Sequence, residues 1–495
     1  MGEDGHEPAS KRVISDNVIF ASVVVGLEAF FLIIYAIWFE FVTDPVDAAK
    51  EVVFYPFFRD ICIMIFFGFG FLMAFLRRAG FTAIGYSFFL AAVVCQYSIV
   101  LDHFFFELGD NPTFSHRRHV GVENMLNGLF CSGACLISFG AFIGKISPLQ
   151  LLVLIIVEPF FYWLNFFIGY IKLEAVDIGG GMFIHTFGCY FGLAACWWLT
   201  SKKTHGHPDN CSCYSSDVFS YAGTLFLWMM WPSFNGILGA DAQEQNRAFF
   251  NTFISLCAST AATFVVSRLV SGHRFDCVHI QNSTLAGGVV MGVAAGLDMH
   301  PSAPIGIGFV TGVISVLGYK YLTPFLSRFG IQDICGIHNL HGMPGVLGSM
   351  VAMWATLGLS YDSNEYEELF PRGRGQAGIQ AAATAISILL GLGSGFFCGF
   401  LMWLVGKLNP IKRADLFNDR DNWHLPSDYE YVVVKDEDDN NVEMEDMNGV
   451  SGSHIRALKN KQVGKVVPAE DGKAPKYSRT GTVMVDGRDS DSDSD

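Results

Sequence analysis

Apolar runs of about twenty residues recur along most of this 495-residue chain. A helix of that length crosses the hydrocarbon core of a bilayer. The composition agrees, because 51% of the residues are hydrophobic and 16% are charged, against about 25% charged residues in a typical soluble protein. We therefore predict an all-α, polytopic membrane protein. A soluble enzyme, a disordered scaffold and a disulfide-built secreted module are excluded.

Twelve windows have the length and apolar character of transmembrane helices. They lie at approximately 17–41, 59–77, 82–105, 123–144, 148–170, 179–200, 218–238, 247–270, 283–299, 303–322, 337–358 and 377–407. The ninth and eleventh are weak by hydropathy because they are rich in glycine, but small residues allow membrane helices to approach closely. We predict a cytoplasmic segment 1–16, a transmembrane channel domain 17–407 and a cytoplasmic tail 408–495.

Lysine and arginine indicate the orientation, because cytoplasmic loops of membrane proteins are enriched in them. With both termini in the cytoplasm, twelve basic residues before the tail face the cytoplasm and eight face the other side. The tail is acidic, ends in Asp489, Asp491, Asp493 and Asp495, and lacks apolar periodicity, so we expect it to be largely disordered after about 435. We expect a multi-pass protein of the plasma membrane with both termini cytoplasmic. The formal net charge of -15 also argues against a nucleic-acid partner.

One pattern, D-I-x-G-x4-H-x6-G, occurs twice. The first copy begins at Asp177 and contains His185; the second begins at Asp333 and contains His341. The copies open the sixth and eleventh predicted helices, and an odd offset of five helices makes them antiparallel. Such an arrangement is typical of inverted repeats, which in transporters bracket a site near the middle of the membrane.

Each histidine follows its aspartate by eight positions, a rise of about 12 Å if the helix is regular. The two histidines are therefore expected at one depth, approached from opposite faces. A single buried histidine is more often a core residue that bonds to a carbonyl. A matched pair favours a functional role, because ionisable groups inside a bilayer usually mark a transport pathway.

Several segments closely resemble the Amt/Mep/Rh ammonium transporter family, and specifically its Rh glycoproteins. They are His185–Gly188 after Asp177, Trp231–Asn235, Asp276–Asn282, Thr284–Gly288, Tyr321–Phe325 and His338–Gly345. These segments occur in family order, within a resemblance that runs from about residue 17 to 430. The sequence departs from many relatives at His338, and the first outer loop has no glycosylation sequon.

The resemblance implies a homotrimer with one pore in each subunit, eleven core helices and an additional N-terminal helix. It further implies that His185 and His341 are paired pore histidines and that Phe130 and Phe234 form an external gate. In such a protein Asp177 and Asp333 are the acidic residues near the two vestibules; the family requires no cofactor or metal and is not enzymatic.

Physical chemistry makes the implied function plausible. Moving the ammonium ion into a narrow apolar channel is far more costly than moving neutral NH3. We expect NH4+ to be recruited at the external vestibule, with cation–π attraction from the two phenylalanines, and NH3 to pass the histidines. Asp177 has two interpretations, a helix cap or a proton acceptor, whereas Asp333, on the exit side, is more simply a structural cap.

Other functions fit parts of the sequence. A CO2 channel or a channel for both gases is the nearest alternative, since a dry apolar pore admits either neutral molecule. An intramembrane metalloenzyme would use His185, His338 and His341, but His338-x-x-His341 lacks the glutamate and the i, i+4 spacing of a zinc helix. A proton- or sodium-coupled solute carrier would need more polar lining than these helices provide.

Overall fold

The fold is described from a computed structural model, whose described residues are 9–110, 117–358, 370, 372–408, 410–426 and 429, with the backbone alone for 9–15 and 110. The chain divides into Met1–Asp436 and Glu437–Asp495. The second part, and with it the predicted disorder of the tail, lies outside the described residues.

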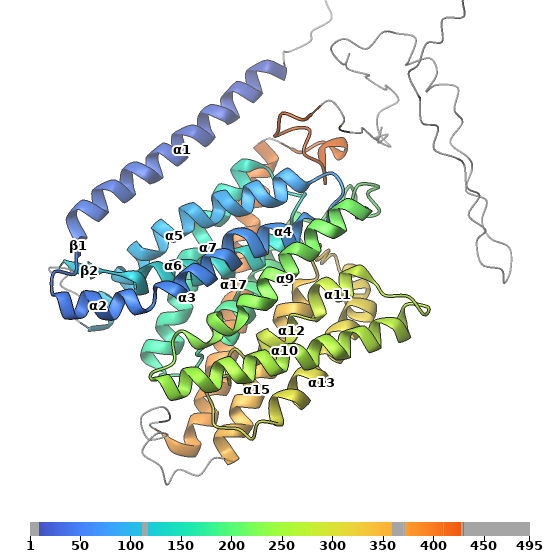
Figure 1. Cartoon of the computed structure of the whole chain (residues 1–495). Coiled ribbons are helices and arrows are strands. Elements are labelled where there is room, and N and C mark those ends of the chain that lie inside the picture. Colours follow the sequence, from blue (N-terminus) through green and yellow to red (C-terminus); the bar gives the residue numbers. More distant parts are fainter. Residues whose placement is uncertain are drawn as a thin grey trace, which may run out of the picture. The chain divides into compact units, whose positions relative to one another are not determined.

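The first half consists of helices and one short strand pair (Figure 1). Its elements are α1 (Ala9–Trp38), β1 (Phe39–Phe41), α2 (Pro45–Val53), α3 (Tyr55–Cys62), η1 (Ile63–Phe69), α4 (Gly70–Leu72), η2 (Met73–Phe75), α5 (Gly80–Asp110), β2 (Arg118–Val120), α6 (Val122–Gly140), α7 (Pro148–Phe166), η3 (Phe167–Lys172), η4 (Gly181–Thr186) and α8 (Phe187–Leu199). Strands β1 and β2 pair in parallel and join the end of α1 to the segment before α6.

The second half repeats the helical pattern. Its elements are α9 (Tyr214–Gly236), α10 (Ala242–Val270), α11 (Cys277–Ser283), α12 (Ala286–Met291), α13 (Ala303–Leu317), η5 (Gly318–Leu322), α14 (Thr323–Ser327), η6 (His338–Gly342), α15 (Met343–Gly358), η7 (Gly373–Gly375), α17 (Gln376–Leu408) and η8 (Arg413–Asp415).

The predicted all-α membrane fold is confirmed. Each of the twelve predicted windows overlaps helical elements, although the first, 17–41, ends in β1 because α1 stops at Trp38. Eight helices of the described residues are long and apolar enough to cross a membrane. The glycine-rich ninth window differs from a regular span, because α12 ends at Met291 and is followed by turns. The eleventh window corresponds to the π-helical turn η6 and to α15, which follows it directly.

Helices pack most closely where small residues face a neighbouring backbone. Helix α17 lies along α8, and a Cβ atom at Gly395 would overlap the backbone of Phe191. The same relation brings α13 onto α10, where a Cβ atom at Gly308 would overlap the carbonyl of Ser255. Contacts between backbones replace the hydrophobic driving force that is missing between helices in lipid.

The segment after α17 binds the start of α5. Asp419 accepts hydrogen bonds from the backbone N–H groups of Phe81 (2.9 Å) and Thr82 (2.8 Å). The indole N–H of Trp423 donates to the hydroxyl of Thr82 at 3.1 Å. Asp419 therefore satisfies two N–H groups that have no partner within their own helix.

We expect Asp419→Ala to destabilise the folded protein by about 1–2 kcal/mol, the usual effect of losing a helix cap. Thermal unfolding of the detergent-solubilised protein measures this as an apparent Tm lower by a few degrees. The matched control is Asp421→Ala, which removes an exposed carboxylate from the same segment. Equal Tm values for the two variants would contradict a capping role.

Candidate functional site

The two repeat histidines meet inside the helical bundle. His185 Nδ1 and His341 Nδ1 lie 3.1 Å apart, and the two rings meet edge to edge in nearly parallel planes, with 5.1 Å between centroids and an interplanar angle of 9°. Both residues are buried, with 1% and 3% of their surfaces exposed. Because one nitrogen donates to the other, the neutral pair has complementary roles at the two Nδ1 atoms.

Each histidine lies on a π-helical turn, His185 on η4 and His341 on η6. The structure differs here from the regular helix assumed in the depth estimate. Asp177 precedes the helix, which begins at Gly181 after a left-handed Gly180 with φ of 68°. The two copies approach closely, since a Cβ atom at Gly345 would lie 2.5 Å from the hydroxyl of Thr186. Single π turns of this kind are frequent at functional sites.

Aromatic rings enclose the histidine pair. Phe130 and Phe234 meet edge to face with centroids 5.0 Å apart, and Phe234 lies 5.8 Å from His185. Trp231 stacks on His185 at 5.7 Å. On the other side Phe69 stacks on His341 at 6.3 Å. The sequence predicted the two phenylalanines, but it did not predict that Trp231 and Phe69 cover the imidazoles. Trp231 lies in the Trp231–Asn235 segment, which was noted for its family resemblance, whereas nothing in the sequence pointed to Phe69.

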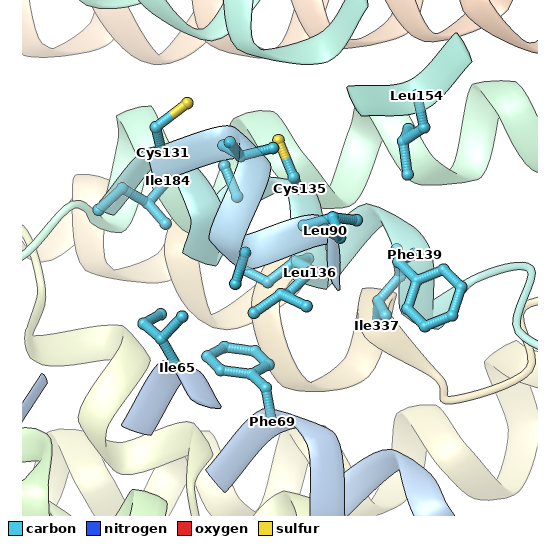
Figure 2. Packing of buried hydrophobic residues seen from close by; sticks show 14 of the residues in the cluster. Ile65, Phe69, Leu90, Cys131, Cys135, Leu136, Phe139, Leu154, Ile184 and Ile337 are labelled. Atoms are coloured by element: carbon cyan, nitrogen blue, oxygen red, sulfur yellow. The ribbon is translucent and has the colours of Figure 1, made fainter. Parts of the chain in front are cut away.

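Two small cavities lie on either side of the histidine pair and the aromatic rings around it. One is lined by Phe130, Ile184 and Asp177 among others. Another is lined by His341, Phe69 and Leu136, with mostly apolar neighbours, and Figure 2 shows Phe69 directed toward Leu136 of α6. The histidine pair therefore lies between a cavity on the Phe130 side and a cavity on the Phe69 side.

Asp177 caps η4 with one carboxylate oxygen, and its other oxygen has no hydrogen-bond partner. Its Oδ2 accepts from the N–H groups of Met182 and Phe183, both at 2.8 Å. Its buried Oδ1 has no protein hydrogen-bond partner. Burial raises the pKa of Asp177 to about 7, against the lowering effect of the backbone N–H groups. The carboxyl group can therefore exist in both protonation states near neutral pH.

Asp333 is the corresponding cap of the second copy. Its Oδ1 accepts from the N–H groups of Gly336 (2.9 Å) and Ile337 (3.0 Å), and its Oδ2 accepts from that of His338 (3.1 Å). Both oxygens are thus used, in contrast to Asp177. Burial also raises the pKa of Asp333.

His338 lies apart from the hydrogen-bonded pair. Its ring contacts Tyr190 edge to face at 5.9 Å, and its Nδ1 is buried without a hydrogen-bond partner. Within the described ranges, no three His, Cys, Asp or Glu side chains gather closely enough to hold a metal ion.

Comparisons with known proteins identify the family of this chain. The Ammonium Transporter Family matches residues 22–420. Rhesus-like glycoprotein B of Dictyostelium discoideum is 44% identical over 470 residues, which cover 88% of this chain and 78% of the relative. Ammonium transporter Rh type B of Oryzias latipes is 44% identical over 391 residues, 76% of this chain and 83% of that protein.

Solved structures show the same fold. Rh50 of Nitrosomonas europaea is 30% identical, with a TM-score of 0.67 over 77% of this chain and 94% of that chain. Mep2 of Saccharomyces cerevisiae shares the fold at 18% identity and a TM-score of 0.58. The apolar helices of this chain agree with a multi-pass membrane protein. The family match shows that the chain belongs to the ammonium transporter family, and its relatives include Rh glycoproteins.

Proposed function

We propose that this protein conducts NH3 through a pore that passes the His185–His341 pair, after recruiting NH4+ on the Phe130 side. The observation that carries the proposal is the hydrogen-bonded histidine pair between two cavities, closed on one side by Phe130 and Phe234. Family membership supports ammonium or ammonia as the substrate.

The surroundings of the histidines favour the neutral molecule. His185 Nε2 is buried without a hydrogen-bond partner, whereas its Nδ1 contacts His341. A neutral NH3 molecule both donates and accepts hydrogen bonds, so it can satisfy this nitrogen during passage. NH4+ would lose its hydration among aromatic and aliphatic side chains, at a cost of many kcal/mol.

Recruitment of the ion is assigned to the cavity on the Phe130 side. Asp177, whose Oδ1 has no hydrogen-bond partner in the protein, is one of the residues that line that cavity. Phe130 lies in the same lining and can hold a cation through its ring face, an interaction of about 0.5–2 kcal/mol. NH4+ would transfer its proton to bulk water on this side, where the proton remains, before NH3 passes the phenylalanine pair.

The assembly proposed here is a homotrimer in the plasma membrane with both termini in the cytoplasm. Many large apolar side chains are exposed on the single chain, including Leu32 (73%), Leu269 (73%) and Leu389 (68%). Lipid or a second copy must cover such a surface. The excess of basic residues on one side supports the orientation.

The test of the histidine pair uses the full chain in vesicles, with internal pH and current recorded together. An ammonium pulse should alkalinise the wild-type vesicles without current if NH3 alone crosses. We expect His185→Ala and His341→Ala each to slow alkalinisation roughly threefold to tenfold, the effect of losing one hydrogen-bond partner for NH3.

The control is His300→Ala, an exposed histidine outside the pore. Each variant is also checked for its oligomeric state and thermal stability. If both pore variants conduct at the wild-type rate with unchanged selectivity for ammonia, the assignment is wrong. A CO2 pulse on the same vesicles separates ammonia selectivity from a general gas pathway.

Phe130→Leu tests the gate. Leucine keeps apolar volume but removes the ring face, so the cation–π attraction of about 0.5–2 kcal/mol is lost. We expect the ammonium concentration for half-maximal flux to rise about threefold or more. Phe139→Leu is the matched control, because Phe139 forms a similar buried edge-to-face pair with Phe142. Equal half-maximal concentrations in the two variants would make Phe130 an ordinary packing residue.

Asp177→Asn separates the two interpretations of Asp177. The amide oxygen can still cap η4, so the Tm should be close to that of the wild type, whereas Asp177→Ala should lose about 1–2 kcal/mol. The wild-type carboxylate becomes charged as pH rises through about 7, and attraction of the cation should strengthen in that direction.

Flux is therefore measured between pH 6 and 8 at constant NH4+ concentration. The ratio of wild-type to Asp177→Asn flux should rise with pH, because NH3 availability changes equally for both proteins. A ratio that does not depend on pH would leave Asp177 only its capping role.

A further inference from the structure

Glu158 is a fully buried carboxyl group in the middle of α7 that takes no part in the proposed transport steps. It faces Ser138 and Cys135 of α6, and Cys398 of α17 lies close to it. Pro159 follows it in the same helix. In the region described by the structure, no cationic side chain neutralises this group, and its polar neighbours are a hydroxyl and thiols.

The hydrogen bonds around Ser138 reveal how many protons are present. Ser138 Oγ lies 2.5 Å from Glu158 Oε1 and 2.7 Å from the carbonyl oxygen of Gly188. Both separations are hydrogen-bond distances between oxygens, so each requires a hydrogen atom. Ser138 supplies one and the Gly188 carbonyl supplies none. The second hydrogen must come from Glu158.

The other carboxyl oxygen supports the same conclusion. Glu158 Oε2 is buried and accepts no hydrogen bond from an N–H or O–H group. An ionised carboxylate would place negative charge on this oxygen inside the hydrocarbon layer, at a large desolvation cost. The carbonyl oxygen of a carboxylic acid tolerates that environment much better.

The hydrogen-bond chain ends on the helix that carries a pore histidine. Gly188 lies three residues after His185, where the π turn η4 passes into α8. At this position α8 and α6 are in backbone contact, since a Cβ atom at Gly188 would lie 2.7 Å from the carbonyl oxygen of Ala134. The bond from Ser138 therefore fixes α8 beside α6 one turn from His185.

We propose that Glu158 is held as a neutral carboxylic acid that donates to Ser138, and that Ser138 in turn donates to Gly188 and positions His185 against His341. Glu158 is thus a positioning residue for the pore and does not itself contact the transported molecule. Its effect on conduction rests on the proposed function of the histidine pair, whereas its protonation does not.

Infrared spectroscopy of the full chain in vesicles tests the protonation. A carboxylic acid absorbs at a C=O frequency well separated from that of a carboxylate. We expect the wild type to show an acid band that persists from pH 5 to 9 and disappears in Glu158→Gln. If Glu158→Gln instead removes only carboxylate absorption, Glu158 is ionised and the proposal is overturned. This readout does not require that the protein conducts ammonia.

Conduction and the histidine resonances test the positioning. Glutamine retains a neutral donor, so Glu158→Gln should keep ammonia flux within about twofold of the wild type and leave the imidazole NMR signals in place. Glu158→Ala and Ser138→Ala break the chain, and we expect each to slow flux at least threefold and shift the signals of His185 and His341. Ser255→Ala is the matched control, because Ser255 also donates from a buried hydroxyl to a glycine carbonyl, that of Gly287 (2.8 Å).

The outcomes separate the proposals. If Glu158→Ala and Ser138→Ala fold normally but leave both flux and histidine signals unchanged, the positioning role is wrong. The proposed conduction past the histidine pair is then unaffected. If the wild type itself does not conduct ammonia, the proposed function fails, and the imidazole signals still report whether Glu158 positions His185. If Glu158→Gln is impaired as strongly as Glu158→Ala, a neutral donor is insufficient and the proposal is overturned.

Discussion

The exclusion of water from the bundle interior governs this structure. Inside a bilayer, a polar group without a partner costs several kcal/mol, so most polar side chains in the core form hydrogen bonds with a neighbour. The His185–His341 pair, the caps formed by Asp177 and Asp333, and the Ser138 hydroxyl all follow this requirement. Two of the buried polar atoms without a protein partner, His185 Nε2 and Asp177 Oδ1, belong to residues on the proposed route of the substrate.

Much of the fold could be predicted because apolar runs of membrane length are a strong signal. The hydropathy signal of the glycine-rich helices was weaker. Helix α12 is short and ends in turns, and its glycines pack closely against other helices. The repeated spacing from Asp177 to His185 and from Asp333 to His341 led to the histidine pair. The spacing gave no sign of the π turns η4 and η6, because it fixes the positions of residues along the chain and not the type of helical turn that carries them.

The parts of the site that escaped sequence analysis depend on contacts between distant segments. Phe69 reaches His341 across more than half of the chain, and no local pattern links the two. The proposed role of Glu158 likewise required the distances from Ser138 to two oxygens. A sequence shows that a buried acid exists; only the geometry of its acceptors shows where its proton lies.

The two repeat aspartates illustrate how an inverted repeat acquires direction. Both cap a π-helical turn, which explains why the same D-I-x-G spacing occurs in each copy. Asp333 uses both of its oxygens for three backbone N–H groups, so its carboxylate has little capacity for a further ligand. Asp177 satisfies its helix with Oδ2 alone and keeps Oδ1 unpartnered in the residue that lines the Phe130 cavity. This difference between the two aspartates is the reason that the proposed function assigns recruitment of the ion to the Asp177 side of the histidine pair.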